Sequence, residues 1–206
     1  PAPRIIKITL DIYKTLKESG YDNILTISRE KLDLVEVDKV NKWFEVNLPS
    51  VVIIAAARVG GIMANKNNPV EFLLDNLKIQ NNLIEASLKN GVKRLLFLGS
   101  SCIYPKYANQ PIQEESLLTG SLESTNDSYA IAKIAGIKLC EAMRRQYNFD
   151  SICLMPTNLY GPGDNYHLEN SHVIPSLLRK FHEAKLDNKD YVTCWGTGKP
   201  LREFLH

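Results

Sequence analysis

Three short apolar runs, none with regular polar alternation, constrain the fold of this chain most strongly. They cover residues 50–57, 94–98 and 151–155. A strand with one solvated face alternates apolar and polar residues, so these runs predict strands that are buried on both faces. Such strands belong to parallel sheets that helices cover on either side. We expect a fourth strand at residues 23–27.

Longer amphipathic stretches separate the apolar runs. Helices are expected at residues 35–46, 69–90, 129–147 and 172–183. Apolar residues recur near helical spacing in the longest of them, as in Phe72, Leu73, Leu77, Leu83, Ile84 and Leu88. Strands and helices that alternate at this length predict a doubly wound α/β fold of the Rossmann-like kind, with a parallel sheet.

Composition excludes several classes of protein. The 206 residues carry 25 Lys and Arg against 23 Asp and Glu, a net charge of +2, which gives no indication of a nucleic-acid partner. The longest apolar stretch, residues 51–57, is too short for a membrane span, and the first residues lack a signal-peptide pattern. We therefore expect no membrane association.

The four cysteines have neither disulfide-scaffold nor metal-ligand spacing. They are Cys102, Cys140, Cys153 and Cys194. This usage is typical of reduced thiols in a cytoplasmic protein, and it indicates no metal site. We expect Cys140, Cys153 and Cys194 to be small buried packing residues.

One constellation suggests chemistry. Ser100 follows a predicted strand, and Tyr129 and Lys133 open a predicted helix in a Tyr-x-x-x-Lys pattern. The Tyr-Lys pair alone is a weak signal, because it recurs by chance on helices. All three residues, however, project toward the carboxyl edge of the sheet, where ligands of open α/β folds bind. There a Lys cation is expected to lower the pKa of the Tyr phenol and favour proton transfer near neutral pH.

These residues resemble the active-site pattern of the extended short-chain dehydrogenase/reductases, and within that family the GDP-L-fucose synthases. The resemblance covers roughly residues 11–206. Its segments are AAARVGGI at 55–62, LFLGSSCIYPK at 96–106, YAIAKIAGIKLCE at 129–141, MPTNLYGP at 155–162, NSHVIP at 170–175 and REFLH at 202–206. The combination goes well beyond the general signature of the superfamily.

The resemblance implies a reaction and a set of roles. Enzymes of this kind take GDP-4-keto-6-deoxy-D-mannose, invert the carbons on both sides of the ketone, and reduce the ketone with NADPH to give GDP-L-fucose. Ser100 and Tyr129 would hydrogen-bond the sugar oxygen, and Lys133 would hold the nicotinamide ribose. Cys102 and His172 would be the acid/base pair of the inversions, and a nearby cation is expected to lower the pKa of the Cys102 thiol.

The same matching implies binding residues. Arg29 would hold the 2′-phosphate and favour NADP(H) over NAD. The other cofactor residues are Ala55, Ala56, Leu98, Gly99, Ser100, Ser101, Lys133, Pro156, Thr157, Asn158, Leu159 and His172. The substrate residues are Lys180, Trp195 and Arg202. The family also implies a homodimer through helices 69–90 and 129–147.

The sequence departs from the family pattern at the N-terminus. The three glycines of the family's phosphate-binding fingerprint fall on Pro3, Ile6 and Thr9. We expect the first strand and its glycine-rich loop to be lost, or the strand to be improvised from residues 4–10. The expected domains are therefore an atypical segment at 1–10, an NADP-binding domain at 11–165, and a truncated substrate-binding domain at 166–206.

Two alternatives remain beside the epimerase-reductase. One is a non-catalytic Rossmann-like module that serves dimerisation. The other is a sister enzyme, either a nucleotide-sugar 4-epimerase or a dehydratase. Cys102 disfavours the 4-epimerase, which has no need of a thiol acid/base beside its Tyr. The segment at 100–105 lacks the carboxylate pair that a dehydratase would need near its Ser.

Overall fold

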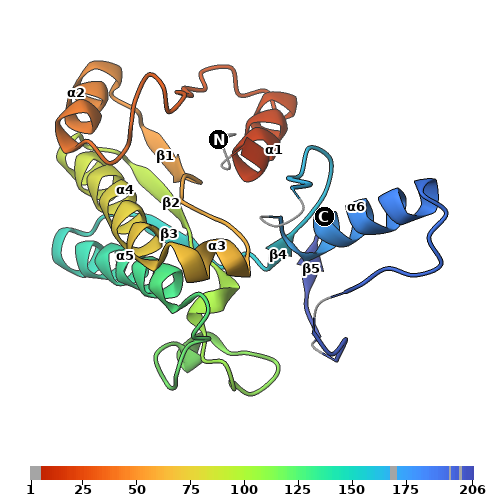
Figure 1. The fold of residues 1–206 in the computed structure, drawn as a ribbon. Helices are drawn as coiled ribbons and strands as arrows, with labels where there is room; N and C mark the ends of the chain where they lie inside the picture. The colour runs from red at the N-terminus through yellow and green to blue at the C-terminus, as the bar shows by residue number, and fades with distance from the viewer. Residues whose placement is uncertain (1–5, 168–170, 195, 200) are drawn as a thin grey trace.

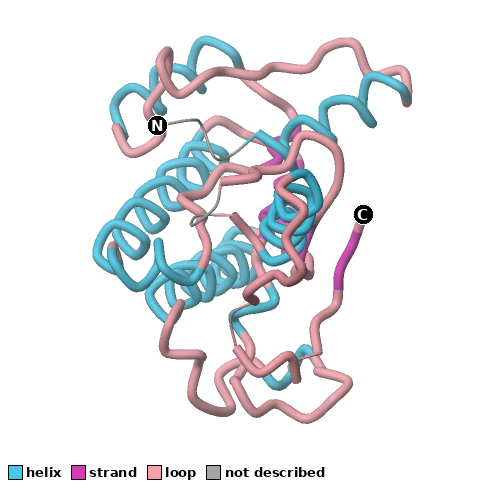
Figure 2. Tube along the Cα trace, turned by 45° about the vertical axis from the view of Figure 1, so that its right-hand side comes forward, coloured by secondary structure: helices cyan, strands magenta, loops and turns pink. Residues whose placement is uncertain are grey.

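The fold is that of a computed structural model, which describes residues 6–167, 171–194, 196–199 and 201–206. Helices and strands alternate along most of the chain (Figure 1). The elements in chain order are α1 (Ile6–Glu18), α2 (Val37–Asn47), β1 (Val51–Ile54), α3 (Ile62–Asn67), α4 (Pro69–Lys89), β2 (Arg94–Leu98), α5 (Asp127–Tyr147), β3 (Ser151–Leu154), β4 (Asn158–Leu159), α6 (Val173–Leu186) and β5 (Phe204–Leu205). A long loop joins the 3₁₀ turn Ser101–Ile103 to α5; it contains a second 3₁₀ turn at Glu114–Ser116 and projects away from the sheet (Figures 1 and 2).

The central sheet is parallel, as the sequence predicts. Its strands lie in the order β1-β2-β3, with Ile54 beside Phe97 and Phe97 beside Cys153. Strands β4 and β5 form a second, two-stranded parallel sheet. Together with the crossover helices this gives the Rossmann-like α/β fold that the apolar runs indicate.

Helices α4 and α5 pack against each other and cover one face of the sheet. Pro69 at the first turn of α4 has the φ that a helix start requires. Helix α5 carries Asp127 in its first turn and ends at Asn148, which takes a left-handed conformation with φ of 52°.

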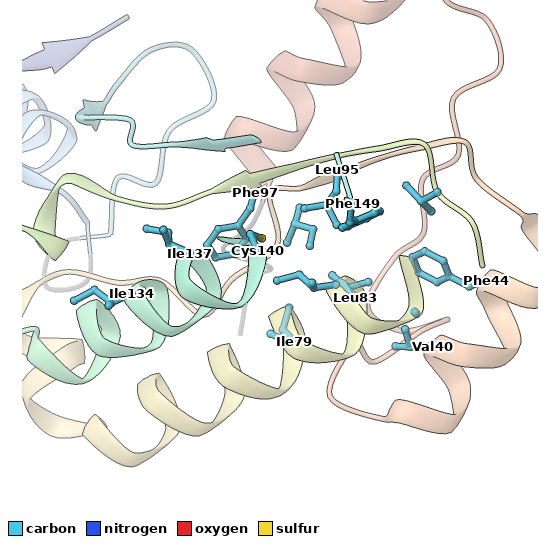
Figure 3. Packing of buried hydrophobic residues seen from close by; sticks show 14 of the residues in the cluster. Val40, Phe44, Ile79, Leu83, Leu95, Phe97, Ile134, Ile137, Cys140 and Phe149 are labelled. Carbon is cyan, nitrogen blue, oxygen red and sulfur yellow. The ribbon is translucent and has the colours of Figure 1, made fainter. Parts of the chain in front are cut away.

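The hydrophobic core lies between this helical layer and the sheet (Figure 3). It joins Leu95 and Phe97 of β2 to Ile79 and Leu83 of α4, Ile134, Ile137 and Cys140 of α5, Val40 and Phe44 of α2, and Phe149. Phe97 and Leu95 are completely buried, so β2 is the strand around which the core is built.

The second face of the sheet departs from the sequence prediction that both faces are buried. Val51, Ile152 and Leu154 remain 56%, 38% and 48% exposed. All three point away from α4 and α5, because side chains alternate between the faces of a strand and Val52, Ile54, Ser151 and Cys153 take the helical side. An uninterrupted apolar run in the sequence therefore does not establish that both faces of the strand are buried in the structure.

The predicted strand at residues 23–27 is wrong. This segment forms neither helix nor strand, and Leu25 and Ile27 are exposed. A strand needs a neighbour for its backbone hydrogen bonds, and none of the described strands pairs with this segment. The improvised N-terminal strand is wrong for residues 6–10, which begin helix α1; Pro3, Arg4 and Ile5 lie outside the described residues.

Gly136 of α5 provides a test of the packing between helix and sheet. A Cβ atom at this position would lie 2.6 Å from Cζ of Phe97 and 2.9 Å from Cδ of Gln80, both on buried side chains. Alanine normally favours a helix over glycine. We nevertheless expect Gly136→Ala to lower the free energy of unfolding by about 1–3 kcal/mol, measured by urea denaturation, because the methyl group overpacks the core.

A double-mutant cycle separates this clash from a general effect on the helix. Phe97→Leu removes the ring edge that the new methyl group would meet, so Gly136→Ala should cost less in a Phe97→Leu background than alone. A stabilising Gly136→Ala, or strict additivity of the two changes, would contradict the packing described here.

Candidate active site

The carboxyl end of β2 places two of the candidate catalytic residues. Beyond Leu98 the chain turns into the 3₁₀ helix Ser101–Ile103, and Ser100 is its N-cap. The Ser100 hydroxyl accepts a hydrogen bond of 3.5 Å from the Cys102 backbone N–H. A serine favours this position because its oxygen satisfies an N–H group that the helix leaves unpaired.

Helix α5 brings two more of the five candidates to the same edge. Tyr129 and Lys133 lie one turn apart, and Nζ of Lys133 lies 5.7 Å from the centre of the Tyr129 ring. The same ammonium group donates a 2.8 Å hydrogen bond to the carbonyl oxygen of Leu98 and lies 4.8 Å from the centre of the Phe97 ring. Lys133 therefore joins the start of α5 to the end of β2.

Electrostatic contacts complete the cluster. The Cys102 thiol interacts with the Ser100 hydroxyl and the Lys133 charge, and the Tyr129 phenol interacts with Cys102. Ser100, Cys102, Tyr129 and Lys133 thus meet at the carboxyl edge of the sheet, as their positions in the sequence predict. We call these four residues the edge cluster.

Burial shifts the pKa of Tyr129 in the direction opposite to the predicted one. The desolvation of the phenolate raises the pKa of Tyr129 far above its ordinary value, and repulsion from Cys102 adds to the increase. The expectation that Lys133 lowers the pKa of Tyr129 is wrong in this structure. The Lys133 ammonium is itself desolvated, which lowers its pKa to about 8.

The expectation of a lowered pKa for the Cys102 thiol is also wrong. Burial raises the pKa of the Cys102 thiol, and this outweighs the opposing effects of the Ser100 hydrogen bond and of the Lys133 charge. Cys102 and Tyr129 are therefore both protonated near neutral pH. The edge cluster offers two proton donors beside one lysine.

His172 stands apart from the contacts that hold the edge cluster. It is the N-cap residue of α6, which begins one residue after the predicted helix start. Burial lowers the pKa of His172, although the nearby Asp164 carboxylate acts in the opposite direction. His172 is therefore a neutral imidazole at pH 7. Among the described residues, no hydrogen bond or charge interaction joins His172 to Cys102.

Three strand ends bring the candidate cofactor residues together. Ala55 and Ala56 follow β1, the segment 98–101 ends β2, and the segment 156–159 follows β3. The Gly99 N–H donates to the Leu154 oxygen over 2.8 Å, and the Ser101 N–H donates to the Pro156 oxygen over 3.3 Å.

Gly99 is confined at this edge. A Cβ atom there would lie 3.0 Å from Sδ of Met155 and 3.3 Å from the Leu154 oxygen. The backbone groups of β2 and β3 thus converge without an intervening side chain, which is how open α/β sheets present a ligand edge.

The remaining candidates lie on exposed segments. Arg29 forms an ion pair of 3.6 Å with Asp33 and keeps 67% of its side chain exposed. Lys180 of α6 donates to the Thr193 oxygen over 3.4 Å, and Arg202 is exposed just before β5. Trp195 lies outside the described residues. None of these contacts connects Arg29, Lys180 or Arg202 with the edge cluster.

Asn76 of α4 is not among the residues predicted from the sequence, and it is almost completely buried. Its Oδ1 accepts from the Arg58 N–H over 2.8 Å, and its Nδ2 donates to the Arg58 carbonyl over 3.0 Å and to that of Phe72 over 2.6 Å. Asn76 thereby clamps the loop that follows β1. The one available signal was a polar residue on the buried face of a helix.

Other features of the described part of the chain do not point to a different site. A cavity of about 290 Å³ lies in the loop before α5, between Pro105, Tyr107 and Thr119. No described helix is long and apolar enough to cross a membrane.

The expected packing role is wrong for Cys194, which is exposed, whereas Cys140 is buried and Cys153 half-buried.

A parallel Rossmann-like sheet with Ser, Tyr and Lys at its carboxyl edge defines a protein of the short-chain dehydrogenase/reductase class. The chain belongs to the NAD dependent epimerase/dehydratase family, whose model matches residues 11–206.

Several proteins similar to this chain carry the name GDP-L-fucose synthase. Probable GDP-L-fucose synthase 1 of Oryza sativa subsp. japonica is 57% identical over 196 residues, and GDP-L-fucose synthase of Escherichia coli K12 is 52% identical over 195. Each alignment covers 95% of this chain, which spans about 60% of the length of these relatives. A GDP-L-fucose synthetase from Naegleria fowleri bound to NADP superposes with a TM-score of 0.81 at 32% identity, over 94% of this chain and 64% of that one.

Proposed function

We propose that this chain provides the catalytic edge of an NADPH-dependent epimerase-reductase that converts GDP-4-keto-6-deoxy-D-mannose to GDP-L-fucose. The observation that carries the proposal is the edge cluster, which combines a Ser-Tyr-Lys set with a protonated thiol. The names of the Oryza sativa and Escherichia coli relatives support the sugar nucleotide. The NADP-bound relative from Naegleria fowleri supports the cofactor.

The inversions require the removal of protons next to a ketone. The developing enolate oxygen must be stabilised by hydrogen bonds that strengthen as its charge grows. The Ser100 hydroxyl and the Tyr129 phenol are donors of the right kind at one edge of the sheet. One polarising pair can therefore serve both inversions and the later reduction.

Cys102 and His172 have complementary protonation states for an acid/base pair. Burial keeps Cys102 a thiol, which has a proton to donate, and keeps His172 a neutral imidazole, which can accept one. We propose that they act on opposite sides of the sugar ring. This arrangement would place the sugar between the two side chains.

Bound NADPH would supply the hydride for the 4-keto carbon. Tyr129 would protonate the reduced oxygen, a role that suits a phenol whose pKa is raised. Lys133 would hold the nicotinamide ribose. Gly99, Ala55 and Ala56 at these strand ends would suit an extended dinucleotide, because small residues let a ligand approach the backbone closely.

A dimer is the second part of the proposal. Val70 and Leu74 of α4 and Ile131 of α5 are large apolar residues exposed on the helical layer. The two helices pack side by side, so these residues offer one apolar surface to a second copy of the chain. The same surface supports the alternative that the chain serves as a dimerisation module without catalysis.

A chimera tests the proposed reaction. The matched segment of the Escherichia coli relative is replaced by residues 11–206 of this chain, so that the relative supplies the remaining length. With NADPH and GDP-4-keto-6-deoxy-D-mannose, we expect GDP-L-fucose as the product, identified by NMR. A product that is reduced without inversion, or no product from a folded chimera, would exclude the proposed function.

Arg29 provides a test of cofactor choice in the same chimera. If its guanidinium holds the 2′-phosphate, Arg29→Ala removes a charge-assisted contact of about 1.5–3 kcal/mol. We expect the affinity for NADPH to fall roughly ten- to a hundredfold while that for NADH stays unchanged, as measured by calorimetric titration. Lys31→Ala, a nearby exposed cation, is the control. Equal losses for both cofactors would return Arg29 to a surface role.

A further inference from the structure

Two cysteines outside the edge cluster lie where helix α5 packs against strand β3. Cys140 lies on α5 and is only 1% exposed, and Cys153 lies on β3. Ser151 and Cys153 alternate with the exposed Ile152 and Leu154, so both point toward α5. The Ser151 hydroxyl donates to the Cys140 carbonyl over 3.3 Å, which fixes this turn of the helix against the strand.

The two side chains meet where α5 packs against β3, and their thiols interact with each other there. This contact raises the pKa of Cys140 and lowers that of Cys153. The Arg144 cation also lowers the pKa of Cys153, whereas burial and the Glu141 carboxylate oppose it. Cys153 is therefore the more nucleophilic sulfur and, being half-buried, the more accessible one.

We propose that Cys140 and Cys153 form a modification site that hydrogen peroxide oxidises to a disulfide between α5 and β3. The Cys153 thiolate attacks one peroxide oxygen and becomes a sulfenic acid, while the other oxygen leaves as hydroxide. The Cys140 sulfur then attacks the Cys153 sulfur and displaces its hydroxyl group, which leaves as water with the Cys140 proton. The two thiols lose two hydrogens in total, and peroxide is reduced to two waters.

The disulfide would join α5, the helix that carries two residues of the edge cluster, covalently to β3. Cys140 lies about two turns beyond Lys133 on α5, and β3 leads directly into the segment 156–159. The neighbouring Cys102 is a poorer nucleophile, because burial raises the pKa of its thiol. The dithiol site is therefore distinct from the site of the proposed reaction and does not depend on it.

Mass spectrometry of the 206-residue chain tests the inference. Cys102→Ser and Cys194→Ser together leave the pair as the sole cysteines. Dilute hydrogen peroxide should then lower the intact mass by two hydrogens and abolish iodoacetamide labelling measured after unfolding. Lys138, Arg144 and Arg145 place the two cysteines on separate tryptic peptides, so the oxidised chain should yield one disulfide-linked peptide pair.

Single variants distinguish a preorganised pair from two independent thiols. In a Cys140→Ser background, Cys153 should accumulate as a sulfenic acid that dimedone traps, because its resolving partner is gone. With Cys140 present, dimedone trapping should fall at least tenfold. Equal trapping in both chains, oxidation of Cys153 to a sulfinic acid with Cys140 still reduced, or disulfide formation no faster in the native chain than in denaturant would overturn the proposal.

Discussion

Replacement of Tyr129 by phenylalanine in the chimera is expected to abolish most of its NADPH-dependent reduction. The change removes only the phenol oxygen and leaves the ring that packs beside Lys133. A general acid typically contributes a factor of 10²–10⁴, so we expect kcat for hydride transfer to fall by roughly that amount. NADPH oxidation followed by absorbance gives the rate. Tyr147→Phe, at the exposed far end of the same helix, is the matched control and should leave the rate unchanged.

The Cys102→Ser variant is expected to affect the inversions more than the reduction. It removes the proposed acid of the inversions but leaves Ser100, Tyr129 and Lys133 in place. Inversion, measured as solvent deuterium uptake at the sugar, should be lost while some hydride transfer to the uninverted 4-keto sugar remains. Equal loss of deuterium uptake and NADPH oxidation would contradict this division of roles.

The elements that the sequence predicted correctly are those whose cause is local. The strand at Arg94–Leu98 has the predicted bounds, and α4 ends one residue before the prediction. Strand β2 is central in the three-stranded sheet and buries Leu95 and Phe97 completely, so its apolar run identifies it. Residues 23–27 look similar, but a strand also requires a neighbour, and pairing is a property of the whole chain.

In the candidate site, too, the sequence predicts some properties and not others. Topology alone places Ser100, Tyr129 and Lys133 at one edge, because the carboxyl ends of parallel strands and the starts of the following helices meet there. The direction of the pKa shifts could not be predicted in this way. Charge pairs can be inferred from sequence spacing, but the depth of burial, which dominates the pKa of both Tyr129 and Cys102, depends on packing.

Lys133 gives a large expected effect on stability as a function of pH. Its pKa falls from an ordinary 10.5 to about 8 on folding, so below pH 8 the protein buries a charge that the unfolded chain keeps in water. Between pH 8 and 10.5 the folded chain loses this proton while the unfolded chain retains it. The unfolded state then binds more protons, and stability rises with pH. From pH 7 to 9.5 this linkage amounts to about 2 kcal/mol.

Lys133→Met should eliminate this rise. Methionine keeps a similar volume without the charge, so the variant and the unmodified chain should differ in the pH dependence of their urea midpoints. Lys138→Met is the matched control on the same helix, since its ammonium is half-exposed and paired with Glu141 over 2.9 Å; it should retain the full rise. The other groups that titrate in this range occur in every variant, so their contributions largely cancel in the comparison. If Lys133→Met kept the same rise as Lys138→Met, Lys133 would have to be solvated in the folded chain, and the close contact of its ammonium group with Leu98 and Phe97 would be wrong.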